Sequence, residues 1–411
     1  NPFLYEKTVH EINYVVIHDI FTPPVASRVF AYSCLASYET LAGEGKQIKS
    51  LSGKINGLNK MPLPGKNEKI DYPFAALIAL TKVGKELIYS QDRVQRVIDS
   101  IKTLASSAGM PDDIYKNSIQ YGEQVADAIM AWSKKDNFAQ TRGSQFTLTH
   151  AEGHWEPTPP GYFEAVEPLW KTIRPMATDS ANMFAPPGPV PFSKDTSSAY
   201  YKQVMDVYNT VNHLDTTQRW IANFWDCNSF KLHVSGHLMF ATKAMTPPGH
   251  WMEIAGIICQ EKHADFYKTV YAYTGIAIGM FDGFVACWYT KYKYDTERPE
   301  TFINKYVDHD WMPYLQTPPF PEYNSAHSTQ SAAAAIFLGK VFTEPLAFRD
   351  STERDWGWPD RSFVSMDEAS KEVSMSRFYG GIHYRKSVWD AYEQGKKIGA
   401  HLYTLMQPQP Q

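Results

Sequence analysis

The 411-residue chain has few cysteines, and their spacing limits what they can do. There are four of them, Cys34, Cys227, Cys259 and Cys287. They are far apart and form no CxxC pair, which argues against a structural zinc or iron–sulfur site. Each lies in an apolar stretch, so we expect buried free thiols. The cysteine count does not fix the redox compartment.

The chain also lacks an excess of charge and a long apolar run. Its net charge is -4, which gives no argument for a nucleic acid or a membrane surface as a partner. No stretch approaches the roughly 20 apolar residues of a membrane span, so we expect none. With 43% hydrophobic and 20% charged residues, the composition is that of a globular protein.

Helical periodicity covers most of the chain, and convincing strand pairs are absent from the pattern. These observations predict an all-α fold, a helical bundle or two fused bundles. The predicted helices are 9–22, 25–42, 73–107, 111–134, 196–212, 215–226, 251–262, 264–294, 328–342, 366–379 and 384–406.

Between the two helical regions lies a long stretch rich in proline and aromatic residues, 136–195. Loops of this length are usually functional or disordered, and the aromatic content argues against disorder. We interpret it as an ordered cover over a site, with a boundary between helical halves as the rival interpretation. The predicted regions are therefore 1–135, 136–195 and 196–411, or one single large domain.

Lys291 and Arg298 form the first of three clusters that could do chemistry. They are seven residues apart, so on a helix they share one face. Pro299 favours a helix end at Arg298. The two cations could converge on one small anion, or they could simply be a solvated charged helix end.

The second cluster is Ser325, Ala326 and His327, which precede a run of four alanines. Alanine favours helix, so these residues fall at a helix N-terminus, where backbone N–H groups can bind an anion. Ser325 could donate to that anion. Alternatively, Asn324 or Ser325 is only the N-cap.

The third cluster is Ser376-Arg377 followed by His383, with Gly380-Gly381 between them breaking the helix. Arg377 and His383 would flank that break, or His383 would be a capped or surface histidine. Taken together, the three clusters place cations, a serine and two histidines at helix ends. These are the ingredients of a phosphate-shaped site.

The combined pattern resembles a known signature: Lys291-x6-Arg298-Pro299, then Asn324-Ser325-Ala326-His327, then Ser376-Arg377-x5-His383. It is similar to that of the superfamily of type-2 phosphatidic acid phosphatases, bacterial acid phosphatases and vanadium-dependent haloperoxidases. The flanks look most like the haloperoxidase branch. They are TrpGluProThrProProGly at 155–161, ThrProProGlyHisTrp at 246–251 and ProProPheProGluTyr before Asn324. The resemblance implies helical bundles of the haloperoxidase/acid phosphatase type with a long Pro-rich loop.

The resemblance also implies a role for each matched residue. Vanadate would be the cofactor, and phosphate could occupy the same site. The residues implied to hold its oxygens are Lys291, Arg298, Ser325, the Ala326 N–H and Arg377. His383 would bond to vanadium in a peroxidase, or attack phosphorus in a phosphatase. His327 would be the acid–base residue, and Trp288 and Phe320 match pocket aromatics on the halide side, although either could be a core aromatic.

Three positions depart from the family pattern. Asn324 stands where the family has Pro, and Ala326 where it has Gly, which adds a methyl group beside the anion. Ser387 stands where the family usually has Asp, four residues after His383, to orient that histidine. Asp390 is on the same face but one turn further.

The leading hypothesis is a vanadate-dependent haloperoxidase that oxidises a halide with hydrogen peroxide. The alternatives are an acid phosphatase or phosphoesterase that uses His383 as nucleophile, and an inactive binding homologue. The expected partners are hydrogen peroxide and a halide, with no nucleic acid and no membrane span. Family habit and the start at Asn1 rather than Met suggest export to a periplasm or out of the cell.

Overall fold

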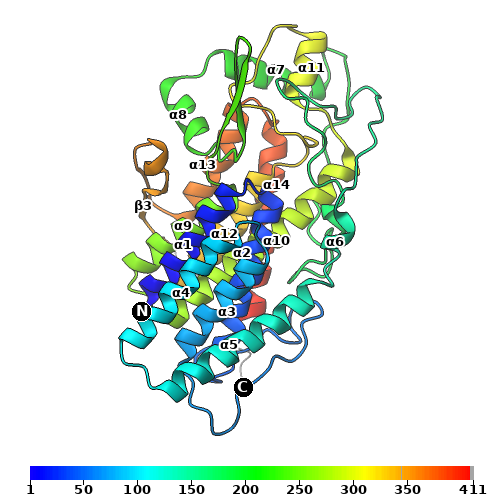
Figure 1. The fold of residues 1–411 in the computed structure, drawn as a ribbon. Helices are drawn as coiled ribbons and strands as arrows, with labels where there is room; N and C mark the ends of the chain where they lie inside the picture. The colour runs from blue at the N-terminus through cyan, green and yellow to red at the C-terminus, as the bar shows by residue number, and fades with distance from the viewer. Residues whose placement is uncertain (344, 408–411) are drawn as a thin grey trace.

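The computed structural model describes residues 1–343 and 345–407, and helices dominate it (Figure 1). The N-terminal helices are α1 (Pro2–His18), α2 (Pro23–Ala42), α3 (Tyr72–Glu86), α4 (Gln91–Ser107), α5 (Asp112–Ser133) and α6 (Phe138–Thr141). The later helices are α7 (Ala199–Asn212), α8 (Thr216–Phe224), α9 (Pro247–Glu261), α10 (Phe266–Tyr294), α11 (Pro299–Tyr306), α12 (Ala326–Phe342), α13 (Met366–Tyr379) and α14 (Arg385–Met406). The all-α prediction is confirmed.

Two short 3-10 helices and two small hairpins complete the described structure. The 3-10 helices are η1 (Trp170–Thr172) and η2 (Thr352–Trp356), and the strands are β1 (Lys231–Ser235), β2 (Leu238–Thr242), β3 (Phe348–Asp350) and β4 (Arg361–Phe363). Each hairpin is antiparallel, with Ser235 opposite Leu238 in the first. The expectation that strand pairs are absent was therefore wrong. Gly236, with a φ of 57°, permits the tight two-residue turn.

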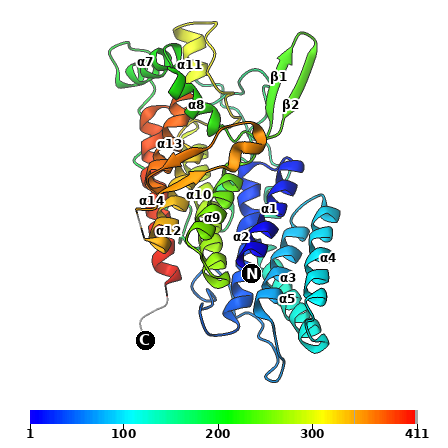
Figure 2. The same cartoon turned by 90° about the vertical axis from the view of Figure 1, so that its left-hand side faces the viewer.

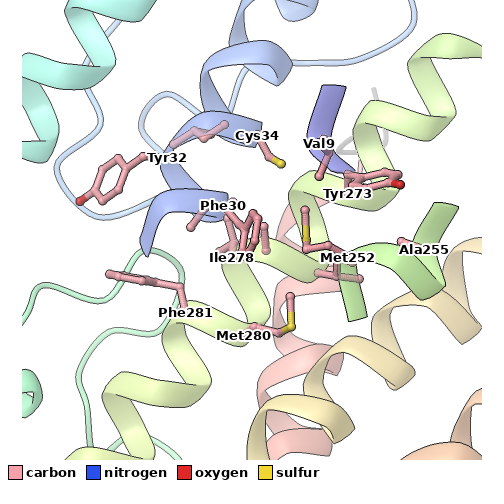
Figure 3. Close-up of a cluster of buried hydrophobic side chains, with 14 of the residues drawn as sticks. Val9, Phe30, Tyr32, Cys34, Met252, Ala255, Tyr273, Ile278, Met280 and Phe281 are labelled. Carbon is pink, nitrogen blue, oxygen red and sulfur yellow. The ribbon is translucent and has the colours of Figure 1, made fainter. Parts of the chain in front are cut away.

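Helix α10 runs through the middle of the molecule and contacts α2 and α9 as well as α12 and α14. Figure 2 shows α1–α5 on one side of it and α12–α14 on the other, while α7, α8 and α11 gather at one end. One continuous buried apolar cluster includes residues of α1, α2, α9 and α10, such as Val9, Phe30, Met252 and Ile278 (Figure 3). The division into the three predicted regions stays a prediction.

Helix α10 is long and apolar enough to cross a membrane by length and composition alone. We expected no apolar stretch of this length, so α10 departs from that expectation. In the folded protein, 94% of its most apolar window is buried. This burial is typical of the central helix of a bundle, which is apolar all round because other helices surround it.

Small residues let α12 and α14 approach closely. The alanines of α12 are buried, and glycines face them from α14. A Cβ added at Gly395 would lie 2.1 Å from the Thr329 carbonyl oxygen, and one at Gly399 would lie 2.4 Å from that of Ala333. This confirms that the alanine run serves close helix packing, and it places the first turn of α12 beside the middle of α14.

The predicted helix 73–107 is in fact two helices, α3 and α4, with a break at residues 87–90. The break is held by a contact that is distant in the sequence. Oδ2 of Asp19, just after α1, accepts the backbone N–H groups of Tyr89 and Ser90. Periodicity alone could not show this, because helical residues flank the break on both sides.

Candidate active site

Lys291 and Arg298 are both fully buried, so the interpretation of a solvated helix end was wrong. Lys291, in the last turn of α10, donates from Nζ to the carbonyl oxygens of Pro321 (2.7 Å) and Glu322 (3.0 Å). Arg298, the N-cap of α11, donates from Nε to the Phe320 carbonyl (2.9 Å) and from Nη1 to that of Ile382 (2.7 Å). Backbone carbonyls therefore aim both cations at one place.

The start of α12 supplies the second part of the site. Ser325 is the N-cap, and its Oγ accepts from the Ser328 N–H (3.4 Å) and the Ser328 hydroxyl (2.9 Å). Both bonds use Oγ as acceptor, so the Ser325 hydroxyl proton can still be donated. Ala326 and His327 follow in the first turn, where backbone N–H groups have no intrahelical acceptor. The capping role and an anion-binding role are thus compatible at Ser325.

Arg377, near the end of α13, is held from the opposite side by the residues that follow α8. Its Nη2 donates to the Trp225 carbonyl (2.5 Å) and its Nη1 to the Asp226 carbonyl (3.3 Å). Asp226 also offers a carboxylate oxygen at 3.9 Å from Nη1. Local sequence patterns could not indicate this support, because the two segments are 151–152 residues apart.

His383 lies at the meeting point of these elements. Its Nε2 is 3.2 Å from Arg298 Nη1, and its Nδ1 is 2.7 Å from Glu322 Oε1. The same carboxylate oxygen accepts from the Tyr384 N–H (3.1 Å). A proton on Nδ1 satisfies Glu322, so the lone pair sits on Nε2, as required of a metal ligand.

The sequence pattern did not indicate Glu322, although its carboxylate contacts His383. We expected an orienting carboxylate four residues after His383, where this chain has Ser387. The carboxylate comes instead from the extended segment before α12, within the quoted stretch ProProPheProGluTyr. Asp390 binds the Tyr323 hydroxyl (2.6 Å) and does not contact His383.

Burial and neighbouring charges keep both histidines neutral. Burial lowers the pKa of His383 well below its ordinary value, and Arg298 and Lys291 lower it further. Burial also lowers the pKa of His327, with Arg377 acting in the same direction and a hydrogen bond to the Asp226 backbone opposing it. Two neutral imidazoles therefore face a group of cations.

The cations are also perturbed, because burial disfavours their charged forms. Burial lowers the pKa of Lys291 to about 7 and that of Arg298 to about 10. Burial raises the pKa of Glu322, against the effect of the two cations beside it. Lys291 is consequently the cation whose charge a bound anion would stabilise most.

A cavity of about 500 Å³ reaches part of this site. Ala326, His327, Arg377 and His383 lie at its polar end. Its apolar walls include Phe163, Val166, Phe230, Pro318, Pro319 and Phe320. The proline-rich stretch 136–195 thus contributes directly to the cavity.

Of the two predicted halide-side aromatics, only Phe320 lines this cavity. Two cations lie close to its ring, with Lys291 Nζ 4.9 Å and Arg298 Cζ 5.1 Å from the ring centre. Trp288 is completely buried behind it, with the two ring centres 5.0 Å apart. Its Nε1 donates to the Val166 carbonyl (3.2 Å), so it supports the wall and does not form the surface.

Two buried polar atoms of the site lack a hydrogen-bond partner within the described residues, namely Arg298 Nη2 and His327 Nε2. Buried polar groups are rarely left unpaired, and exceptions mark places where a ligand or ion binds. An oxyanion would satisfy Arg298 Nη2 and add charge compensation for Arg298, Lys291 and Arg377. The donor set therefore fits a small anion with several oxygens.

The comparisons with known proteins agree with this geometry. Residues 271–410 match the family model of the VCPO second helical-bundle domain. A solved structure described as the first bacterial vanadium-dependent iodoperoxidase is 40% identical, with a TM-score of 0.92, over 99% of this chain and 97% of that one. The chain belongs to the vanadium-dependent haloperoxidase family.

More distant haloperoxidases share the fold alone. The holo form of a bacterial vanadium-dependent chloroperoxidase is 16% identical, with a TM-score of 0.70, over 94% of this chain and 93% of that one. Its apo form is 15% identical with a TM-score of 0.71. No curated protein sequence matches the chain.

Proposed function

We propose that this haloperoxidase binds vanadate and oxidises halide with hydrogen peroxide, and that iodide is its preferred halide. The observation that carries the proposal is the neutral His383, whose Nε2 lone pair faces the cluster of Lys291, Arg298 and Arg377. A neutral imidazole among cations suits a vanadium ligand, since the cations neutralise the oxygens while Nε2 supplies the bond.

The residues that would hold vanadate are the ones assembled above. Lys291, Arg298 and Arg377 neutralise the charge on the oxygens, and the Ser325 hydroxyl and the Ala326 N–H donate to them. His383 Nε2 is the ligand. Bound vanadate supplies the chemistry that activates hydrogen peroxide toward the halide.

His327 is the acid–base residue in this proposal. It lines the cavity, its ring is fixed by the Asp226 backbone, and its Nε2 has no partner among the described residues. Nε2 takes the proton that hydrogen peroxide releases and returns it as water leaves. The overall reaction, halide plus hydrogen peroxide plus one proton giving hypohalous acid and water, balances with His327 regenerated.

The preference for iodide rests on the relative that is 40% identical over nearly the whole chain, which is an iodoperoxidase. The cavity is consistent with it. Phe163, Phe230 and Phe320 give the halide side an apolar, polarisable surface, which favours a large, weakly hydrated anion over a small one.

Vanadate reconstitution followed by a halogenation assay tests the proposal. We expect peroxide-dependent turnover with kcat/KM in the order iodide, bromide, chloride. Turnover with none of the three would refute the haloperoxidase activity. Hydrolysis of a phosphomonoester by the vanadate-free protein, lost in His383→Ala, would instead support the phosphatase alternative, and no anion binding at all would support the inactive homologue.

We also propose export of the protein to a periplasm or out of the cell. Hypohalous acid damages cellular thiols and amines, so its production outside the cytoplasm spares the cell that makes it. Fractionation of the producing cells would test this, with recovery of the protein in the cytoplasmic fraction as the contrary result.

A further inference from the structure

A buried cluster of metal-ligand side chains lies beside the cavity, outside the proposed vanadate site. Cys227 follows α8, His250 lies in the first turn of α9, and Glu353 belongs to η2. One ligand atom from each lies within 4.8 Å of the other two. All three residues are buried, with exposed fractions of 7%, 1% and 5%.

The distances between these atoms suit a tetrahedral ion. Cys227 Sγ lies 3.4 Å from His250 Nδ1, and Nδ1 lies 3.4 Å from Glu353 Oε1. Around zinc, neighbouring sulfur, nitrogen and oxygen ligands are about 3.3–3.6 Å apart, as follows from the metal–ligand bond lengths. The remaining pair, the sulfur and the carboxylate oxygen, lies within 4.8 Å and needs to close by roughly 1.3 Å at most to complete the set.

Asp350 holds the other side of the histidine. Its Oδ2 lies 2.8 Å from His250 Nε2, while its Oδ1 is fixed by the N–H (3.0 Å) and hydroxyl (2.7 Å) of Thr352. A proton on Nε2 leaves the Nδ1 lone pair directed at Cys227 and Glu353. A carboxylate bound to the distal nitrogen is the arrangement that orients histidine in protein metal sites.

The acidic groups of the cluster also favour a bound cation. A thiol and two carboxyl groups are buried together with a single imidazole. Buried charges are costly unless they are paired or coordinate a metal. A divalent cation would neutralise the Cys227 thiolate and the Glu353 carboxylate together, while Asp350 stays paired with the histidine.

We propose that Cys227, His250 and Glu353 bind a zinc-class divalent ion, with Asp350 as a positioning residue. A mixed sulfur, nitrogen and oxygen set suits zinc, and three protein ligands leave a fourth position for water. Cys227 lies on the cavity wall, which gives the ion a path of entry. These ligands come from three distant segments, so the absence of a CxxC pair does not exclude them.

The ion would also steady the vanadate site. The Trp225 ring stacks on His250, with ring centres 4.6 Å apart and planes at 25°. The Trp225 carbonyl accepts from Arg377, so the same short segment touches both sites. Loss of the ion should therefore weaken vanadate binding, by roughly tenfold if Arg377 is misdirected as in other supporting-shell mutations.

Metal analysis of the wild-type protein tests the proposal without any activity assay. We expect about one equivalent of zinc in protein purified without chelator, as the ligand set implies. After chelation, added Co²⁺ should give a thiolate-to-cobalt absorption band. Cys227→Ser should abolish that band, and Asp350→Asn should weaken Co²⁺ affinity roughly 10–100-fold. The matched control is Cys259→Ser, which removes a buried thiol of α9 and should leave both the band and the Co²⁺ affinity unchanged.

The absence of both bound zinc and a cobalt band in the wild-type protein would overturn the proposal. Retention of the band in Cys227→Ser would also overturn it. So would alkylation of Cys227 by iodoacetamide at the same rate with and without Co²⁺, since a ligand thiolate is shielded. These measurements do not depend on halogenation, so failure of the metal site can be distinguished from failure of the proposed haloperoxidase activity.

Discussion

Replacing Glu322 with glutamine perturbs the contact that orients His383 while keeping the size of the side chain. Glutamine still offers an oxygen to Nδ1–H, but it carries no charge. A hydrogen bond to a charged partner contributes about 1.5–3 kcal/mol and a neutral one about 0.5–1.5 kcal/mol. The loss of roughly 1–2 kcal/mol corresponds to about 5–30-fold weaker vanadate binding.

Removal of a negative charge would by itself favour anion binding, but its effect on the buried Lys291 is opposite. Glu322 raises the pKa of Lys291, which burial has already lowered to about 7. Without Glu322 that pKa falls further, so Lys291 is mostly neutral at pH 7. The substitution therefore removes a cation from the site instead of freeing one.

Calorimetric titration of vanadate into Glu322→Gln and wild type measures the effect. Glu297→Gln is the matched control, because Glu297 is also a buried glutamate but binds the Tyr200 hydroxyl (3.0 Å). We expect weaker binding in Glu322→Gln and no change in the control. Equal or tighter vanadate binding in Glu322→Gln would show that the Glu322 carboxylate does not strengthen anion binding.

Three further predictions follow from the same structure. The His327→Ala variant should bind vanadate as wild type does, but its kcat should be lower by roughly 10²–10⁴-fold, the usual contribution of an acid–base residue. Vanadate binding and the halogenation rate are measured in parallel, and loss of vanadate binding would contradict the acid–base assignment. Sulfate keeps a constant charge from pH 5 to 9, so its affinity should be constant below about pH 7 and fall about tenfold per pH unit above it, because an anion binds the protonated form of Lys291. A sulfate affinity that does not change from pH 6 to 9 would contradict this. Gly399→Ala should lower the free energy of unfolding by about 1–3 kcal/mol through overpacking, and Gly283→Ala should lower it less, because the nearest atom would be 3.5 Å from the added Cβ. Thermal denaturation compares the two variants, and equal melting temperatures would count against the close packing of α12 and α14.

The sequence predicted those parts of the fold and the site that depend on local pattern. The helices follow from periodicity, and the break at Gly380-Gly381 correctly separates α13 from α14. The positions of the candidate residues at helix ends follow from the same signals. Their roles stay predictions.

The contacts that orient these residues could not be predicted, because they join segments far apart in the chain. Glu322 reaches His383 across 61 positions, and the Trp225 carbonyl reaches Arg377 across 152. The hairpin of β1 and β2 is a different case. Polar and apolar residues alternate in β1, and Gly236 marks a turn, but β2 is a continuous apolar run that shows no strand period.

We propose His383 Nε2 as the vanadium ligand, with Lys291, Arg298 and Arg377 around the vanadate oxygens. A crystal of the vanadate-loaded protein, with anomalous diffraction recorded at the vanadium edge, tests it directly. We expect one anomalous peak within bonding distance of His383 Nε2, with oxygen density toward the three cations. A peak bonded to His327 instead, or none in this cavity at full vanadate loading, would contradict it.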